Sequence, residues 1–235
     1  MQAEIITIGD ELLIGQVVDT NSAWLGRTLG EDGIKVTQIT SVQDDADQIA
    51  RTVNEALARV SIVLVTGGLG PTRDDITKHT LAELFGMRLV RDEQVYETVR
   101  RQLAVRGIAF NELNRGQALV PDGCTVLPNR NGTAPGMWFE RGGKILVSMP
   151  GVPFEMKALV TDEVLPRLRT HFSLHANVHR TAITFGLAES ILAERIAPWE
   201  AALPANLRLA YLPSALCIRL RLSAYETDPE KARSE

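Results

Sequence analysis

The sequence predicts an α/β protein with a three-layer, mostly parallel sheet, followed by a small α+β unit. Two observations lead to this prediction. Before residue 171, short apolar runs alternate with helical patterns, which is typical of parallel strands covered by helices on both faces. After residue 171 the expected order changes to strand, helix, strand, strand. We therefore expect a first domain over residues 1–170 and a βαββ unit with a linker over residues 171–235.

Composition and charge are those of an ordinary globular protein. Of 235 residues, 45% are hydrophobic and 23% charged, which allows a sizeable core and excludes a disordered or fibrous chain. A formal net charge of −4 provides no basic face, so no nucleic-acid partner is expected. Cys124 and Cys217 lie far apart and predict neither a disulfide framework nor a zinc knuckle. Without a signal-like start or a span-length apolar stretch, we expect a cytoplasmic protein with no membrane partner.

The first domain begins with a βαβαβ pattern. The expected strands are Glu4–Ile8, Ile34–Val42 and Ile62–Val65, and the expected helices are Asn21–Leu29 and Asp47–Val60. In such a unit, ligands bind beyond the carboxyl ends of the parallel strands. The loops that leave the three strands at this edge carry acidic residues, and they are expected to bring together Glu11, Asp44, Asp74 and Asp75.

The loop after the third strand, from Thr66 to Thr77, carries the strongest functional signal. It reads as a strand end, a glycine-rich turn and an acidic helix start. Glycine lets backbone N–H groups approach an anion, and a helix N-terminus adds unpaired N–H groups. The residues expected to bind phosphate here are Gly67, Gly68, Gly70 and Thr72.

Two acidic residues in this loop, Asp74 and Asp75, suggest a divalent metal held between carboxylates and phosphate oxygens. The competing interpretation is a tight structural loop in which Asp74 caps the helix. The loop lacks the Gly-Lys-Ser/Thr ending of a P-loop. It also lacks the third glycine of a dinucleotide fingerprint, because Arg73 stands there. Both standard phosphate motifs are therefore excluded.

The rest of the first domain continues the pattern. Helices are expected near Ile76–Phe85 and Glu93–Arg106, a hairpin pairs Met137–Glu140 with Lys144–Ser148 across Arg141-Gly142-Gly143, and a helix runs from Pro153 to about Arg169.

Two loops in this part are candidate ligand contacts. Turn residues from Asn129 to Gly136 include Gly132 and Thr133. Pro150 and Gly151 precede the helix that begins at Pro153, which offers a second helix N-terminus to an anion, with Glu155 close by.

The second unit is expected to contain strands near Val178–Phe185, Leu207–Leu212 and Leu216–Tyr225, with a helix at Ala188–Trp199. This order has some likeness to an RNA-binding KH module. However, no Gly-x-x-Gly clamp occurs, and seven acidic residues balance seven basic ones after His171. We interpret the unit as a structural or dimerising appendage, which favours a homodimer. The polar tail Thr227–Glu235 is expected to be a linker or frayed end.

Two further patterns have competing interpretations. His171, His175 and His179 recur every four residues and would align on a helix as metal ligands, but the β-like run here argues against a metal site. Asp19 and Asn21 stand at a helix start. They either cap that helix or hold ribose hydroxyls, and the sequence leaves both interpretations open.

Five ordered motifs resemble the competence/damage-inducible CinA family. They are Ile8-Gly9-Asp10-Glu11-Leu12-Leu13-Ile14-Gly15, Asp19-Thr20-Asn21-Ser22, Thr66 to Asp75, Gly132-Thr133-Ala134-Pro135-Gly136 and Pro150-Gly151-Val152-Pro153-Phe154-Glu155-Met156. The resemblance covers nearly the whole chain. Up to about Thr170 it extends to the molybdopterin-binding fold of molybdenum-cofactor biosynthesis proteins and gephyrin-type domains.

The resemblance implies a metal-dependent ADP-ribose pyrophosphatase that releases AMP and ribose 5-phosphate, with Mg²⁺, Mn²⁺ or Co²⁺ as cofactor. By motif, the acids that handle metal and phosphate are Asp44 and Asp75. Longer family members add a nicotinamide-nucleotide amidohydrolase domain, so deamidation of nicotinamide mononucleotide is not expected of this chain. The sequence departs from the family at Asp10, where a neutral residue is common.

The resulting hypothesis is a hydrolase for a small nucleotide, with Asp44, Asp74 and Asp75 as catalytic residues and Asp44 and Asp75 as metal ligands. The residues expected to bind substrate are Glu11, Asp19, Asn21, Gly67, Gly68, Gly70, Thr72, Gly132, Thr133, Gly136, Pro150, Gly151 and Glu155. Two alternatives stay open. One is a molybdopterin-binding or adenylyl-transfer protein on the same fold, and the other is a non-catalytic nucleotide-binding module.

Overall fold

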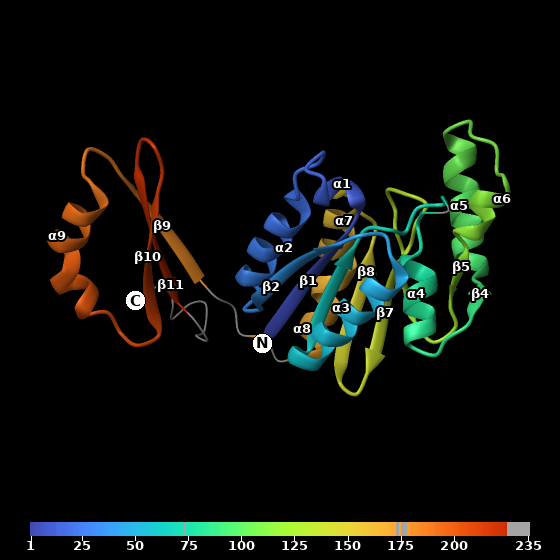
Figure 1. Ribbon diagram of the computed structural model, residues 1–235, viewed down its shortest axis with the longest axis horizontal. Helices are drawn as coiled ribbons and strands as arrows, with labels where there is room; N and C mark the ends of the chain where they lie inside the picture. Colours follow the sequence, from blue (N-terminus) through green and yellow to red (C-terminus); the bar gives the residue numbers. More distant parts are fainter. Residues whose placement is uncertain (73, 173, 175–177, 225–235) are drawn as a thin grey trace. The chain divides into compact units, whose positions relative to one another are not determined.

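The computed structural model describes residues 1–72, 74–172, 174 and 178–224 (Figure 1). The chain divides into two compact units. One comprises Met1–Gly26 and Lys35–Phe172, and the other comprises Arg27–Ile34 and the chain from Ser173 onward. The domain limits expected from the sequence, 1–170 and 171–235, remain a prediction.

The first unit is built on a six-stranded sheet in the order β2-β1-β3-β8-β7-β6. The strands are β1 (Gln2–Ile8), β2 (Lys35–Val42), β3 (Ile62–Thr66), β6 (Thr125–Leu127), β7 (Gly136–Arg141) and β8 (Lys144–Met149). The four strands β2, β1, β3 and β8 are parallel, whereas at one edge β7 pairs antiparallel with β8, and β6 pairs antiparallel with β7. The predicted mostly parallel sheet is confirmed.

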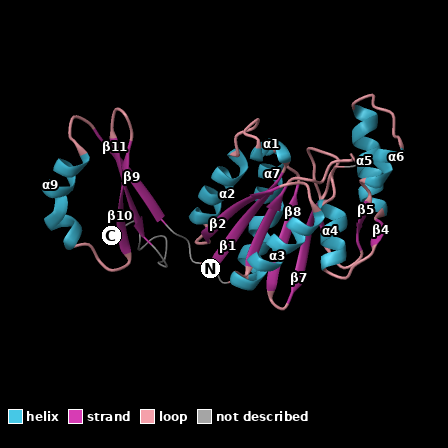
Figure 2. Ribbon diagram, in the orientation of Figure 1, coloured by secondary structure: helices cyan, strands magenta, loops and turns pink. Residues whose placement is uncertain are grey.

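Helices lie on both sides of this sheet (Figures 1 and 2). The helices described before residue 172 are α1 (Asp10–Leu13), α2 (Thr20–Glu31), α3 (Ala46–Arg59), α4 (Thr77–Leu84), α5 (Glu93–Val105), α6 (Glu112–Gly116), α7 (Pro153–Leu159) and α8 (Leu165–His171). A π-helical turn, Val160–Val164, joins α7 to α8.

The alternation of side chains along the strands explains the layers. On β1, Ile6 and Ile8 pack into the same core cluster as Ile49 and Val53 of α3, while the fully buried Ile5 points to the other face. Each such side chain stabilises the fold by about 1.5–3 kcal/mol relative to exposure. Because both faces are apolar, both must be covered by helices.

The sheet order places a topological switch point between β1 and β3. From β1 the chain moves outward to β2 and then returns to β3 on the other side of β1. Loops that follow β1 and β3 therefore diverge at the carboxyl edge and leave a crevice, which is where open α/β sheets bind ligands.

One predicted boundary in this unit was wrong in detail, and one predicted helix differs in its interior. The hairpin turn contains only Gly142 and Gly143, because Arg141 pairs with Lys144; both glycines have the positive φ that a two-residue turn requires. The helix predicted from Pro153 to about Arg169 is present, because α7, the π-helical turn and α8 follow one another to His171, but it is not α-helical throughout. Pro166 has no N–H to donate, and the chain inserts the π-helical turn just before it.

Several short elements were not predicted. Strands β4 (Leu89–Arg91) and β5 (Leu119–Pro121) form a two-stranded sheet beside α5 and α6. Here Val95, Val99 and Leu103 of α5 form a separate small core. Three-residue strands are too short to show an alternating pattern in sequence.

The second unit contains β9 (Val178–Thr184), α9 (Glu189–Ala201), β10 (Leu207–Pro213) and β11 (Ile218–Ala224). Its strands form an antiparallel sheet in the order β10-β11-β9, which confirms the predicted βαββ unit. His179 on β9 hydrogen-bonds Ser223 on β11 at 2.8 Å. His175 and the tail Thr227–Glu235 lie outside the described residues.

Candidate functional site

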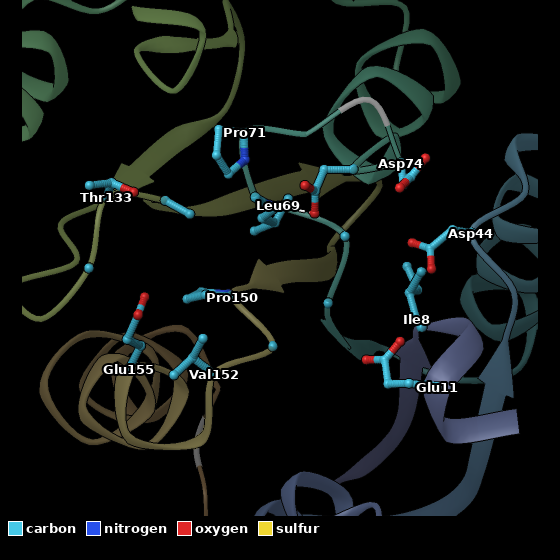
Figure 3. A pocket seen from close by; sticks show the side chains of 18 of the residues that line it. Ile8, Glu11, Asp44, Leu69, Pro71, Asp74, Thr133, Pro150, Val152 and Glu155 are labelled. Carbon is cyan, nitrogen blue, oxygen red and sulfur yellow. Dashed lines mark hydrogen bonds between the residues drawn. The ribbon is translucent and has the colours of Figure 1, made fainter. Parts of the chain in front are cut away.

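A cavity of about 590 Å³ lies at the carboxyl edge of the parallel strands of the first unit (Figure 3), and we call it the main cavity because most of the predicted site residues line it. Loops that follow β1, β2, β3 and β8 meet there, together with the loop before β7. The predicted site residues that line it are Glu11, Asp44, Gly67, Gly68, Gly70, Asp74, Asp75, Gly132, Thr133, Pro150, Gly151 and Glu155.

The glycines of the β3–α4 loop allow a close approach of backbones. Gly67 has a φ of 114°, and a Cβ there would lie 2.0 Å from the carbonyl oxygen of Ile8. Gly68 has a φ of 63°, and a Cβ there would collide with the side chain of Thr77. Only glycine therefore lets this loop turn against the end of β1.

Asp75 organises the same loop from within. Its carboxylate accepts hydrogen bonds from the N–H of Gly70 at 2.7 Å and the N–H of Thr72 at 2.9 Å, and from the Thr72 hydroxyl at 2.5 Å. The amides of Gly70 and Thr72 are thus already bound to an internal anion. Asp75 remains a predicted metal ligand, but its observed role is to hold the loop.

Helix α4 begins later than the acidic helix start that the sequence suggested. Its first residue is Thr77 and its N-cap is Ile76, so Asp74 and Asp75 lie in the loop before the helix. Asp74 therefore does not cap α4. It is exposed and lines the cavity instead (Figure 3). In the described part of the chain, the amides of Gly68 and Leu69 make no hydrogen bond, which leaves them for an anion.

The cavity is strongly acidic. Glu11, Asp44 and Asp74 lie on one side, and Glu155 lies on the other (Figure 3). Burial raises the pKa of Asp44, as do the charges of Asp10, Glu11 and Asp75, while the N–H of Asp10, 3.3 Å from Asp44 Oδ2, opposes this. This crowding of like charges would be relieved by a cation.

Asn129 positions Glu155. Its amide Nδ2 donates to Glu155 Oε2 at 2.7 Å and to the carbonyl oxygen of Ala134 at 2.8 Å, while its Oδ1 accepts from the N–H groups of Asn131 and Gly132. A Cβ on Gly132 would lie only 1.9 Å from Glu155 Oε2. A hydrogen bond and close packing therefore hold this loop against the start of α7.

Asp19 and Asn21 lie in a smaller pocket of about 100 Å³ that also contacts Glu11 and Gly151. Asp19 Oδ1 accepts from the N–H of Ser22 at 2.9 Å, which confirms its capping role in α2. Asn21 Nδ2 donates to the carbonyl oxygen of Gly151 at 2.7 Å and ties α2 to the loop before α7. Asn21 Oδ1 has no partner among the described residues.

Two further predicted substrate residues, Thr72 and Gly136, also lie outside the main cavity lining. Thr72 binds Asp75, as described above. Gly136 is buried at the start of β7, where a Cβ would lie 2.5 Å from Leu159 Cδ2, so its observed role is close packing.

Sequence reasoning missed Arg106 and Asn129. Arg106, just after α5, lines the cavity and donates from Nη2 to the carbonyl oxygen of Asn131 at 2.9 Å. No motif marks an arginine that reaches the site from a distant helix. For Asn129, the turn-rich run was visible, but the partner Glu155 was not.

The residues of the cavity fit a metal ion that is held jointly by the protein and a substrate phosphate better than a metal ion held by protein ligands alone. Among the described residues, no three His, Cys, Asp or Glu side chains are grouped closely enough to hold a metal. Mg²⁺ is commonly bound by one or two carboxylates together with water and substrate phosphates. Asp44, with Glu11 and Asp75 near it, supplies hard oxygen donors of this kind.

Both parts of the chain match known protein families. The family described as "Probable molybdopterin binding domain" matches residues 4–170, and the "Damage-inducible protein CinA KH domain" matches residues 179–235. A solved structure described as the protein CinA with unknown function, from Thermoplasma acidophilum, is 34% identical. Its TM-score is 0.65, and the match covers 73% of this chain and 98% of that one. This chain belongs to the CinA family.

The curated relatives of this CinA-family chain are CinA-like proteins. That of Cytophaga hutchinsonii is 48% identical over 99% of this chain and 56% of its own length, and that of Flavobacterium psychrophilum is 45% identical over 100% and 56%. The chain thus spans about half the length of the curated relatives it matches.

A solved structure of molybdenum cofactor biosynthesis protein B is 24% identical, with a TM-score of 0.50 over 73% of this chain and 92% of that one. This likeness shows a common fold. Separately, in the residues that the structure describes, no helix has both the length and the apolar character needed to cross a membrane.

Proposed function

We propose that this CinA-family chain hydrolyses the pyrophosphate bond of ADP-ribose to AMP and ribose 5-phosphate with the help of a divalent cation. One observation carries the proposal. The cavity combines glycine-loop amides with five carboxylates, and Arg106 is the one cationic side chain among the described residues that line it. An acidic surface repels a polyanion unless a cation lies between them. A pyrophosphate that arrives with a divalent cation satisfies both features.

The residues divide the work between cation and phosphate. Asp44 and Asp75 would hold the cation, while the amides of Gly68 and Leu69 bind phosphate oxygens and Arg106 binds the opposite side of the pyrophosphate. When bound, the cation supplies positive charge to the phosphate oxygens and increases the acidity of water. In the reaction, the oxygen of water bonds to one phosphorus, the bridging P–O bond breaks, and the proton leaves to solvent.

The test is release of AMP from ADP-ribose with Mg²⁺, Mn²⁺ or Co²⁺, with Asp44→Asn in parallel. We expect metal-dependent AMP release by the natural chain, and a loss of at least about a hundredfold in the variant. A folded chain that binds ADP-ribose but releases no AMP with any of these metals would leave a non-catalytic nucleotide-binding module as the better description.

A second candidate is binding of molybdopterin, or adenylyl transfer to it. The description of the family that matches residues 4–170 favours this candidate more directly than it favours hydrolysis. Molybdopterin also carries a phosphate, so the same glycine loop would serve it. Tighter binding of molybdopterin than of ADP-ribose by the purified chain, together with absent AMP release, would support this candidate over the first.

A further inference from the structure

A second cavity opens beside the main one, between α5 and the segment 126–135, with a volume of about 170 Å³. Gly132 and Thr133 line both cavities, so the two are adjacent, and we call the second cavity the side arm. Figure 3 places Thr133 on the side of the main cavity away from Asp44 and Glu11. The side arm therefore adjoins the main cavity at the end that lies opposite most of the carboxylates.

The walls of the side arm are mainly apolar. Its apolar lining residues are Val95, Val99, Val126, Pro128 and Pro135. Of these, Val95 is 8% exposed and Val99 is 1% exposed, so this wall is part of the small core under α5. An apolar wall of this kind favours a flat, uncharged ring over a phosphate or a hydrated sugar.

Some of the polar groups that line the side arm already make hydrogen bonds within the protein. The carboxylate of Asp92 accepts from the N–H of Val95 at 2.9 Å, and Asn129 is occupied by its own loop and Glu155. Gln94 and Thr98 remain at the rim as groups that can exchange hydrogen bonds with ring nitrogens. Only one carboxylate lines the side arm, against five in the main cavity.

Helix α5 lines the side arm, and the residue that follows its last turn lines the main cavity. Val99 lines the side arm, and Arg106 lines the main cavity seven residues later, about 10 Å along the helix axis. A ligand with a ring at one end and a pyrophosphate at the other can therefore contact the same helix twice. The side arm holds the volume of about five or six liquid waters, which is comparable with one purine ring system.

We propose that the side arm binds the adenine base of the nucleotide, with Val95, Val99 and Thr98 against the ring and Gln94 at its edge. This inference rests on the proposed function, since it requires a pyrophosphate in the main cavity. It assigns the base to α5 and the segment 126–135, and it leaves the pocket of Asp19 and Asn21 for the other half of ADP-ribose.

The test uses the full chain and two probes, ADP and inorganic pyrophosphate, titrated calorimetrically with Mg²⁺ present. Thr98→Phe fills the side arm, while Val105→Phe adds a ring at an 84% exposed site of the same helix and is the matched control. We expect Thr98→Phe to weaken ADP at least tenfold and to change pyrophosphate less than twofold. Val105→Phe is expected to leave both affinities unchanged.

Gln94→Ala provides a second variant that does not alter packing, because Gln94 is exposed. It is expected to weaken ADP about threefold, as for one lost hydrogen bond, and to leave pyrophosphate unchanged. Thermal unfolding of each variant confirms that the fold is intact.

The possible results separate this inference from the proposed function. Pyrophosphate binding with no gain in affinity for ADP, or ADP binding that Thr98→Phe does not weaken, overturns the adenine subsite alone. Neopterin triphosphate, titrated in the same way, serves as a pterin probe. If Thr98→Phe weakens its binding and leaves ADP binding unchanged, the side arm binds a pterin, and the adenine subsite is overturned. A natural chain that binds neither ADP nor pyrophosphate overturns both proposals.

Discussion

The acidic residues of the cavity have different local tasks. Asp75 is held by three donors and closes the β3–α4 loop, and Glu155 is held by Asn129. Among the described residues, Asp44 by contrast accepts a single long hydrogen bond, from the N–H of Asp10 at 3.3 Å, and it faces other carboxylates. A substitution at Asp75 would therefore change both the folding of the loop and the chemistry of the site. A substitution at Asp44 tests the chemistry without disturbing the loop.

Asp44→Asn is expected to abolish AMP release while leaving the protein as stable as before or more stable. The amide keeps the shape and removes a charge that burial and nearby acids disfavour. Activity assays and thermal unfolding on the same preparation check this. A clear fall in melting temperature together with retained activity would contradict it. Asp75→Asn is the comparison, and it should lower the melting temperature because it weakens the bonds to Gly70 and Thr72.

Lys78 is a buried cation whose Nζ donates to the carbonyl oxygen of Gly116 at 2.9 Å. Burial lowers its pKa from 10.5 to about 8, against the opposing charge of Asp75. Between pH 8 and pH 10.5 the unfolded chain binds more protons at this site than the folded chain, so stability rises with pH there.

Relative to Lys78→Met, the free energy of unfolding of the natural chain should rise by about 2 kcal/mol from pH 7.5 to pH 10. Urea unfolding at both pH values in metal-free buffer measures this difference. A constant difference between the two proteins across the range would show that Lys78 keeps an ordinary pKa.

At the scale of elements, the site depends on how closely the β3–α4 loop approaches the end of β1. Gly67 N–H donates to the carbonyl oxygen of Met149 at 3.1 Å, while its Cα faces Ile8. Gly67, which follows β3, thereby contacts the carboxyl ends of β1 and β8 as well. The hairpin glycine Gly142 also has a positive φ, 60°, but a Cβ there meets nothing within 4 Å.

Gly67→Ala should therefore cost more stability than Gly142→Ala. The hairpin variant meets only the unfavourable backbone region, about 1 kcal/mol, while Gly67→Ala adds a collision with backbone and should cost about 3 kcal/mol or more. Denaturant unfolding of both variants gives the comparison. Equal losses would mean that the loop can move away from Ile8 freely.

At the scale of the whole molecule, the cavity is made entirely by residues between Ile8 and Glu155. The described residues of the βαββ unit contribute nothing to its lining. We therefore propose that pyrophosphate and nucleotide bind to the first unit alone, and a homodimer formed through the KH-type unit remains our prediction.

A chain that ends at Phe172 is expected to bind ADP and pyrophosphate with affinities within about twofold of the full chain, because it keeps all the lining residues. Calorimetry on both chains measures this. Loss of binding by a shortened chain that retains its circular dichroism would indicate that the second unit completes the site.

Much of the fold was predictable because its longer elements repeat a pattern. Helix α3 and strand β3 are long or apolar enough for periodicity and burial to agree, and their predicted limits were nearly correct. The three-residue strands β4 and β5 carry no such pattern. The helix after Pro153 was found, but its π-helical turn arises from a local conflict at Pro166 that periodicity does not register.

The sequence by itself determined the strand-loop-helix order and the residues that follow each strand. Glu11, Asp44 and Gly68 could be assigned to one edge because carboxyl ends of parallel strands meet there. Only the tertiary structure decided which acids hold loops, as Asp75 does, and which face the cavity, as Asp44 does. It also decided that Arg106 reaches the cavity and that a side arm opens under α5. These depend on contacts between residues distant in the chain, and such contacts leave no periodic signal in the sequence.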